Sequence, residues 1–326
     1  MKKQIINDIE QKMRSVLNNE QRKRLEEVLE YAFYGIEIIK TDNDEKNQTD
    51  YSDIFVSAKR VEGCSERTLN YYKTTIDNML NSVDKKVNNI ETDDLRKYLA
   101  DYQLNNQCSK VTIDNVRRIL SSFFAWLEDE DYIIKSPTRR IHKIKTMKTV
   151  KETYSDEELE EMRDSCDEIR DLALIDFLSS TGVRVGELVN LDIKDIDFEN
   201  RSCVVLGKGS KQREVYFDAR TKIHLQNYLS TRADNNQALF VSLLHPFNRL
   251  KISGVEIRLR ELGNKININR VHPHKFRRTM ATKAIDKGMP IEQVQVLLGH
   301  SKIDTTLEYA MVNQNNVRNS HKRFIC

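Results

Sequence analysis

The sequence predicts a mainly α-helical protein of two domains, with one small antiparallel β-sheet in the second domain. Apolar residues recur at helical spacing over most of the 326 residues, whereas alternation typical of strands is confined to residues 193–217. The chain has only 4 Pro and 10 Gly, which argues against an all-β protein rich in turns. Its length is sufficient for two domains that each bury a core.

Charge and cysteine content exclude several classes of protein. The 53 Lys and Arg nearly balance 50 Asp and Glu, and a net charge of +3 says little about partners because mixed surfaces give the same total. None of the 5 cysteines lies in a C-x-x-C pair, which argues against a disulfide framework or a cysteine-rich zinc site. No stretch approaches the roughly 18 apolar residues of a membrane span, and the N-terminus lacks the apolar core of a signal peptide. We therefore expect a cytoplasmic protein with no membrane partner.

Residues 1–50 are expected to form one or two helices followed by a polar connector. Ile5, Ile9 and Met13 recur at helical spacing, and a second apolar series begins at Leu25. The run TDNDEKNQTD then separates this slightly acidic segment from the rest of the chain. We treat it as an extra N-terminal segment.

Residues 51–134 are expected to form a helical domain of three or four amphipathic helices. Ser65 with Thr68 opens one helical segment, and Thr92, Asp93 and Asp94 are candidate N-caps of the next. Apolar residues at helical spacing follow in both segments. The broadest apolar stripe begins at Ile113 and ends near Trp126. We find no convincing strand pattern in this part of the sequence.

The charge pattern changes abruptly after this domain. Residues 135–151 hold seven Lys or Arg, no acid and a helix-breaking proline, whereas residues 152–171 hold ten acids and two arginines. We expect an extended basic linker over 135–151 and a solvated helix that opens a second domain over 152–312. The linker charge is explained equally well by solubility and by contact with nucleic acid.

The second domain is expected to surround a small sheet with helices. Helices are expected at 159–181 and 185–191, and helical patterns resume from Thr221, with interruptions at His272-Pro273 and Gly288. Short alternating runs occur at 193–198, 203–206 and 215–217. The last two runs flank GKGSKQR, which predicts a hairpin with a glycine-rich basic turn.

Four short stretches carry residues suited to catalysis. They are TGVRVGEL (181–188), LGKGSKQREV (206–215), HPHKFRRTMAT (272–282) and LLGHSKIDTTLEYA (297–310). Each has an ordinary explanation when taken alone, such as a simple turn for GKG or core packing for Tyr309. Together they supply the parts of a phosphoryl-transfer site.

The residue types indicate how such a site would operate. Guanidinium groups bind the non-bridging oxygens of a phosphodiester bidentately, so Arg184 and Arg277 are expected to hold the phosphate. Lys208, on the hairpin tip, can protonate a leaving oxygen, and His274, one helical turn before Arg277, can act as acid or base. No pair of carboxylates accompanies these groups, which disfavours a two-metal mechanism.

The remaining candidates lie around the phosphate-binding arginines. His300 follows a glycine, and a turn there would point its imidazole at the site; nine residues later, Tyr309 offers a phenol as a covalent nucleophile. Glu187 lies three residues beyond Arg184, and we favour a supporting role for it over a simple surface ion pair. The H-x-H pair of His272 and His274 has no third ligand nearby, so no metal is expected.

In this order and spacing, the candidates resemble the catalytic pattern of the tyrosine recombinase, or phage integrase, family: Arg, a hairpin Lys, H-x-x-R, then His or Trp, and a Tyr nucleophile. The matching positions are Arg184, Lys208, His274, Arg277, His300 and Tyr309. Residues 51–134 are similar to the helical core-binding domain of the family. The sequence departs from the pattern at Arg278, where the family usually has His, and residues 1–50 lack the signals of an arm-type DNA-binding domain.

The resemblance implies a site-specific recombinase or integrase that cuts and rejoins DNA through a covalent 3′-phosphotyrosine, without a cofactor. It implies a homo-tetramer on double-stranded DNA, in which we expect the tail 313–326 to dock on a neighbouring protomer. The alternative is a tail that folds back on its own domain or frays. It leaves open whether the enzyme serves a mobile element, such as a phage or transposon, or the chromosome. The residues expected to contact DNA are Lys135, Arg139, Arg140, Lys143, Lys145, Lys148 and Lys211.

Two alternatives use the same fold. A type IB topoisomerase shares the tyrosine chemistry but relaxes DNA without a partner site, and the helical domain before the catalytic one favours a recombinase over it. A DNA-binding regulator would keep the fold without activity. All six positions hold competent side chains, which argues against such a loss.

Overall fold

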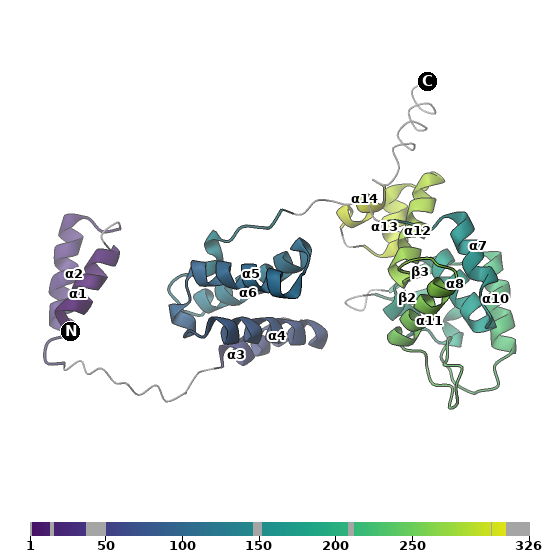
Figure 1. Ribbon diagram of the computed structural model, residues 1–326, viewed down its shortest axis with the longest axis horizontal. Coiled ribbons are helices and arrows are strands. Elements are labelled where there is room, and N and C mark those ends of the chain that lie inside the picture. The colour runs from purple at the N-terminus through teal and green to yellow at the C-terminus, as the bar shows by residue number, and fades with distance from the viewer. Residues whose placement is uncertain are drawn as a thin grey trace, which may run out of the picture. The chain divides into compact units, whose positions relative to one another are not determined.

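The computed structural model describes residues 2–13, 16–36, 50–145, 152–207, 212–300 and 302–310. The chain divides into two compact units, 1–146 and 147–326, and an apolar core is buried in each. Figure 1 shows the helices and strands of both. Helices dominate both units, and a three-stranded antiparallel sheet lies in the second. The predicted fold class is therefore confirmed. Among the described residues, no helix has both the length and the apolar character needed to cross a membrane.

The N-terminal segment forms a helical hairpin. Helix α1 (Lys2–Met13) is followed by α2 (Asn19–Ala32), and Asn18 caps α2 by accepting from the backbone N–H of Gln21 at 2.9 Å. All of α2 stays at least partly exposed, because two short amphipathic helices cannot enclose a core.

Four helices build the body of the first unit: α3 (Tyr51–Val61), α4 (Glu66–Val83), α5 (Thr92–Asn106) and α6 (Lys110–Asp129). The side chain of Ser65 caps α4, and that of Ser109 caps α6. The apolar stripe of α6 is buried, and Phe55 packs edge to face with Phe123 and with Trp126. These contacts fill the helical core predicted from the periodicity.

The first part of the expected linker packs against this unit instead of extending away from it. Residues Pro137–Arg140 form a short 3-10 helix (η2), and the backbone N–H of Ile144 donates to Asp114 at 3.0 Å. Ile141 and Ile144 contact the apolar core. Apolar residues interleaved with the basic ones therefore hold residues 135–145 in place, so the expectation of an extended linker is wrong over this range.

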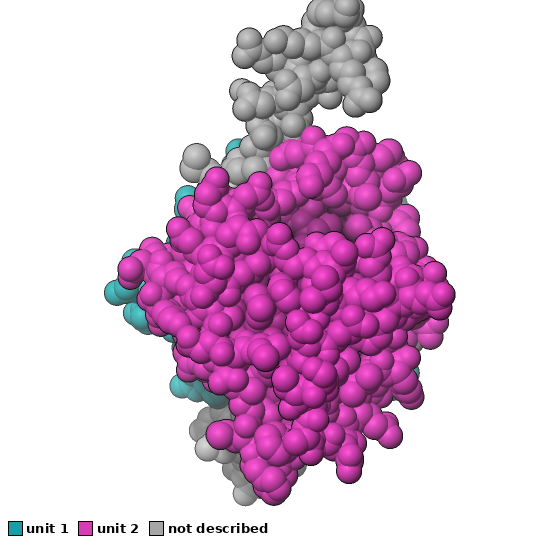
Figure 2. All heavy atoms as spheres, turned by 90° about the vertical axis from the view of Figure 1, so that its right-hand side faces the viewer, with its two compact units in different colours: residues 1–146 teal, residues 147–326 magenta. Residues whose placement is uncertain are grey.

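The second unit surrounds its sheet with helices, and Figure 2 shows it as one continuous body. The sheet consists of β1 (Ile196–Asp197), β2 (Ser202–Leu206) and β3 (Gln212–Tyr216) in that order. The helices are α7 (Asp156–Asp164), α8 (Ile169–Thr181), α9 (Val185–Leu188), α10 (Ala219–Ser230), α11 (Ile252–Lys265), α12 (Pro273–Asp286), α13 (Ile291–Leu298) and α14 (Asp304–Ala310). The mostly buried α8 packs against α7, α10 and α12.

The hairpin predicted around GKGSKQR is present. Strands β2 and β3 pair antiparallel, with Ser202 opposite Tyr216 and Leu206 opposite Gln212. This register leaves residues 207–211 as the connection at the tip, and residues 208–211 lie outside the described part of the chain. The structure therefore establishes the two strands of the hairpin, β2 and β3, and their register.

The segment between α10 and α11 departs from the prediction. The prediction that helical structure continues from Thr221 is wrong here, because residues 232–251 form an irregular connection between the two helices. The guanidinium of Arg232 donates to the carbonyls of Asn236 and Ala238, each at 2.6 Å. A buried side chain therefore satisfies backbone groups that a helix would have paired internally.

Candidate active site

The C-terminal end of α13 is held by three arginine side chains from other parts of the second unit. The last carbonyls of a helix have no partner within the helix and accept from side chains or water. Here the donors are guanidinium groups: Arg213 donates to the carbonyl of Leu297 at 2.9 Å, Arg277 to that of Leu298, and Arg184 to that of Gly299 at 3.2 Å. The partial negative charge at a helix C-terminus favours cations. Segments distant in the sequence therefore meet at this turn.

Arg184 comes from the turn between α8 and α9. Helix α8 ends at Gly182, whose backbone has a φ of +60°, and a Cβ there would lie 2.2 Å from Cε of Met280. The left-handed backbone conformation therefore favours the glycine of the TGVR stretch, and a larger residue would also have to displace the terminal methyl group of Met280. The Arg184 side chain is 35% exposed, so it reaches solvent while it remains bonded to the turn after α13.

Glu187 binds Arg184 through both of its oxygens. Oε2 accepts from the backbone N–H of Arg184 at 2.8 Å, and Oε1 accepts from its guanidinium at 2.8 Å. Burial of Glu187 opposes ionisation, but hydrogen bonds from Arg213 and Arg184 outweigh it and lower its pKa to about 2. The contact is thus a buried ionic one and not a surface ion pair.

Arg213 completes this arrangement, and the sequence reasoning missed it. Its Nη1 and Nη2 donate to the two oxygens of Glu187, each at 2.7 Å, in a bidentate ion pair. A signal was present: in β3, Arg213 lies two residues before the buried Val215 and so shares its inward face. A charged residue at such a position is expected to have a partner.

Arg277 lies deepest among the three arginines. Its side chain projects from α12, is only 2% exposed, and donates to the carbonyl of Gly182 at 2.6 Å. Burial lowers its pKa to about 10, and the neighbouring charges of Arg184 and Arg213 act in the same direction. The group therefore remains a cation at neutral pH.

His300 points its imidazole into the arginine cluster. Its Nε2 lies 3.2 Å from Nη2 of Arg277, and its Nδ1 lies 2.9 Å from Oγ1 of Thr306. Burial lowers the pKa of His300 to about 4, and the charges of Arg277, Arg184 and Arg213 add to this effect. The imidazole is therefore neutral at physiological pH.

Tyr309 lies on α14, directly beyond this turn. Its ring centroid is 5.8 Å from that of His300, and its side chain packs against a small apolar cluster that includes Met280 and Leu298. The structure thus brings four of the six predicted catalytic residues together: Arg184, Arg277, His300 and Tyr309.

The other two predicted catalytic residues are less completely placed. His274 is exposed on the first turn of α12, one turn before Arg277 and close to His272. Lys208 lies outside the described residues, as does Lys211. Within the described part of the chain, no group of three or more His, Cys, Asp or Glu side chains could hold a metal ion.

The predicted DNA-contacting residues that are described all lie on the surface of the first unit. They are Lys135, Arg139, Arg140, Lys143 and Lys145, and all are exposed. Arg139 also pairs with Glu128 at 2.7 Å. Lys148 lies outside the described residues.

Comparisons with known families cover both units. The phage integrase family matches residues 145–316, and the N-terminal SAM-like domain of phage integrases matches residues 52–134. Tyrosine recombinase XerC of Staphylococcus aureus (strain USA300) is 30% identical over 290 residues, which cover 83% of this chain and 96% of the relative. XerC of Oceanobacillus iheyensis is 29% identical over 290 residues, 84% of this chain and 95% of the relative.

Solved structures share the fold. The XerH site-specific recombinase bound to a palindromic difH substrate matches with a TM-score of 0.68 at 20% identity, over 97% of this chain and 93% of that one. The Tn1549 transposon integrase in complex with circular intermediate DNA matches with a TM-score of 0.66 at 20% identity, over 83% and 98%. On these matches, the chain belongs to the phage integrase family and is a tyrosine-type site-specific recombinase.

Proposed function

We propose that this recombinase cuts and rejoins double-stranded DNA through a covalent bond between Tyr309 and the 3′ phosphate of the cut strand. The observation that carries the proposal is the convergence of Arg184, Arg277 and His300 on the turn that leads to the helix of Tyr309. Such a cluster of cations and a phenol suits attack on a phosphodiester.

The reaction balances with residues of this chain. The Tyr309 oxygen bonds to phosphorus, the bond from phosphorus to the 5′ oxygen breaks, and that oxygen takes a proton from Lys208. The tyrosine proton passes to His274. Because one phosphate ester replaces another, a 5′ hydroxyl from a partner strand can reverse the step without ATP.

The basic surface of the first unit is the second part of the proposal. Exposed lysines at positions 135, 143 and 145 suit the phosphate backbone of a duplex, because contacts of this type need no base-specific geometry. Arg139, Arg140, Lys148 and Lys211 belong to the same proposed contact set.

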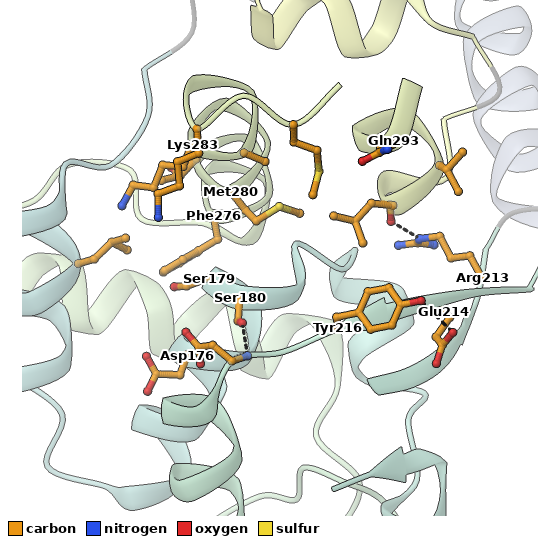
Figure 3. Close-up of a pocket in the computed structure, with 18 of the residues that line it drawn as sticks. Asp176, Ser179, Ser180, Arg213, Glu214, Tyr216, Phe276, Met280, Lys283 and Gln293 are labelled. Carbon is orange, nitrogen blue, oxygen red and sulfur yellow. Dashed lines mark hydrogen bonds between the residues drawn. The ribbon is translucent and has the colours of Figure 1, made fainter. Parts of the chain in front are cut away.

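We further propose assembly as a tetramer, in which the tail 313–326 docks on a neighbouring protomer. The second unit carries a groove of about 1170 Å³, bordered by α7, α8, α12, α13 and β3 (Figure 3). Its lining includes apolar side chains and two lysines: Phe276, Met280, Met289, Val296, Lys283 and Lys287. The tail is apolar at Val317, Phe324 and Ile325, which suits this lining.

Covalent capture tests the proposed reaction. The protein is incubated with sheared genomic DNA from its own host, and covalent adducts are recovered by precipitation with detergent and potassium. The fragments recovered are then rebuilt as nicked duplexes that trap the cut state. Wild type should form an adduct on them and Tyr309→Phe should form none; an adduct with Tyr309→Phe would refute the assignment.

The relatives are named as recombinases, which favours strand exchange over the topoisomerase and regulator alternatives. A cytoplasmic location is part of the proposal, since the DNA substrate lies there in a bacterial cell. Relaxation of plasmids that lack a captured site would count against strand exchange as the main activity.

A further inference from the structure

We propose that Arg213 is a positioning residue for DNA cleavage, which holds Glu187 and the turn after α13 so that Arg184 and His300 face one phosphate. The inference rests on the proposed function. The Arg213 guanidinium donates its hydrogen bonds to Glu187 and Leu297 and would therefore act on cleavage through these neighbours.

All three nitrogen atoms of Arg213 are engaged by the protein. Nη1 and Nη2 donate to the oxygens of Glu187, and Nε donates to the carbonyl of Leu297. The side chain is only 10% exposed, and Figure 3 shows it at the end of β3 nearest α13. A guanidinium bound in this way fixes the geometry of its partners, because its donors form a rigid planar fork.

The first consequence concerns Arg184. Each oxygen of Glu187 accepts one bond from Arg213 and one from Arg184, whose guanidinium reaches only Oε1. Without Arg213, both oxygens would be open to the Arg184 guanidinium, and a bidentate ion pair would form. Such a pair would turn Arg184 away from an incoming phosphate. In Arg213→Ala, loss of the guanidinium would also lower the net charge of the cluster, which otherwise combines three arginines with Glu187.

The second consequence concerns His300. The backbone of Gly299 has a φ of +63° and passes so close to Arg213 that a Cβ there would lie 2.9 Å from its Cδ. The Arg213 stem therefore forms the surface on which this turn rests. Since His300 is the next residue, the position of its imidazole depends on Arg213.

The third consequence concerns the hairpin. Arg213 is the second residue of β3 and lies opposite Val205 of β2, so it is attached to the strands that carry the tip with Lys208. One side chain thus connects three elements: β3, α9 and α13. Arg184 directly precedes α9, and His300 follows the turn after α13.

The test separates positioning from folding. Arg213→Lys and Arg213→Ala are compared with Arg232→Lys, which alters an equally buried, ion-paired arginine elsewhere in the unit. Single-turnover cleavage of the nicked duplex captured by wild type gives a rate constant and an amplitude. Loss of folded protein lowers the amplitude, whereas misplaced groups lower the rate constant.

We expect the rate constant of both Arg213 variants to fall by about 100-fold, as for other misplaced catalytic groups, with DNA affinity within about threefold of wild type. Arg232→Lys should keep the wild-type rate constant. A rate constant within about threefold of wild type in Arg213→Lys and Arg213→Ala would overturn the inference, and so would a loss of affinity as large as the loss of rate. The adduct of wild type and its absence in Tyr309→Phe report on the proposed function separately.

Discussion

The Nη2 atom of Arg277 lies 3.2 Å from Nε2 of His300, and the arginine is the donor because a guanidinium cannot accept. The imidazole therefore carries its proton on Nδ1, from which it donates to the hydroxyl of Thr306 at 2.9 Å. This tautomer agrees with a pKa for His300 of about 4, lowered by burial and by the adjacent arginines. The geometry makes His300 a neutral hydrogen-bonding group.

This state of His300 predicts a specific loss of stability in acid. The pKa of His300 in the folded state lies below the usual 6.5. The neutral imidazole therefore makes its whole contribution to the free energy of unfolding above pH 6.5, and this contribution is lost as the pH falls towards 4. Urea unfolding at pH 7.5 and at pH 5 should show wild type losing about 1 kcal/mol more than His300→Gln, allowing for partial exposure. His142→Gln, at an exposed site, should behave as wild type. Equal losses in wild type and His300→Gln would contradict the prediction.

Glu187→Gln should destabilise the second unit strongly. It removes the negative charge between Arg184 and Arg213, and breaking a buried ionic contact costs about 3 kcal/mol. Glu199→Gln, at an exposed site, should stay within about 0.5 kcal/mol of wild type in the same urea titration. Because the folded pKa of Glu187 is about 2, its contribution is full above pH 4.5 and is lost as the pH falls towards 2. The difference in free energy of unfolding between wild type and Glu187→Gln should therefore shrink below pH 4.5. A constant difference would argue against this account.

Gly299→Ala should reduce cleavage as well as stability. The new Cβ would meet Arg213, whereas the same change at Gly288, with a φ of +93° and no atom within 4 Å, adds backbone strain alone. We expect Gly288→Ala to lose about 1 kcal/mol and to keep its cleavage rate constant, and Gly299→Ala to cleave at least about tenfold more slowly. Equal rate constants in the two variants would show that the contact with Arg213 has no effect on cleavage.

Neutralising the basic surface of the first unit should weaken DNA binding without slowing cleavage at saturation. Lys135→Gln, Lys143→Gln and Lys145→Gln should each reduce the dependence of log affinity on log salt by about one unit. Lys59→Gln is the control, because Lys59 of α3 is paired at 2.7 Å with Glu62, the residue that follows the helix. Fluorescence anisotropy at several salt concentrations measures the slope, and an unchanged slope in all three variants would remove these lysines from the contact set.

A charge in the groove should impair recombination without impairing binding to one site. Val296 lines the groove and is 72% exposed, so Val296→Glu should fold normally. Recombination of two sites should fall about tenfold, deletion of 313–326 should have a similar effect, and the two changes should not add. Ile223→Glu, at another exposed apolar site of the unit, should recombine normally. Additive losses would indicate that the tail binds elsewhere.

The candidate catalytic residues were predictable from sequence because they stand in short stretches with a distinctive combination of residue types. Arg184, Arg277, His300 and Tyr309 stand in short stretches where glycine, histidine and arginine recur, and the structure brings these four together. Their roles stay predictions. Arg213 was missed because an arginine in a basic hairpin has no unusual feature until the partner of its inward-facing side chain is known.

The linker and the connection after α10 were mispredicted for a different reason. The charges of residues 135–145 obscured the two isoleucines that hold this segment, and their contact with the core depends on tertiary structure. The connection over 232–251 is organised by Arg232, which donates to carbonyls up to seven residues ahead. Periodicity detects neither type of interaction, because each depends on a side chain meeting a distant or irregular backbone.

Leu297 belongs to two surfaces at once. Its side chain lines the groove, and its carbonyl accepts from Arg213. Helix α13 has 8 residues, a rod of about 12 Å that moves as one piece. Any molecule that enters the groove and displaces α13 must therefore also displace the carbonyls held by the three arginines. Helix α13 therefore couples the groove mechanically to Arg184, Arg213 and Arg277.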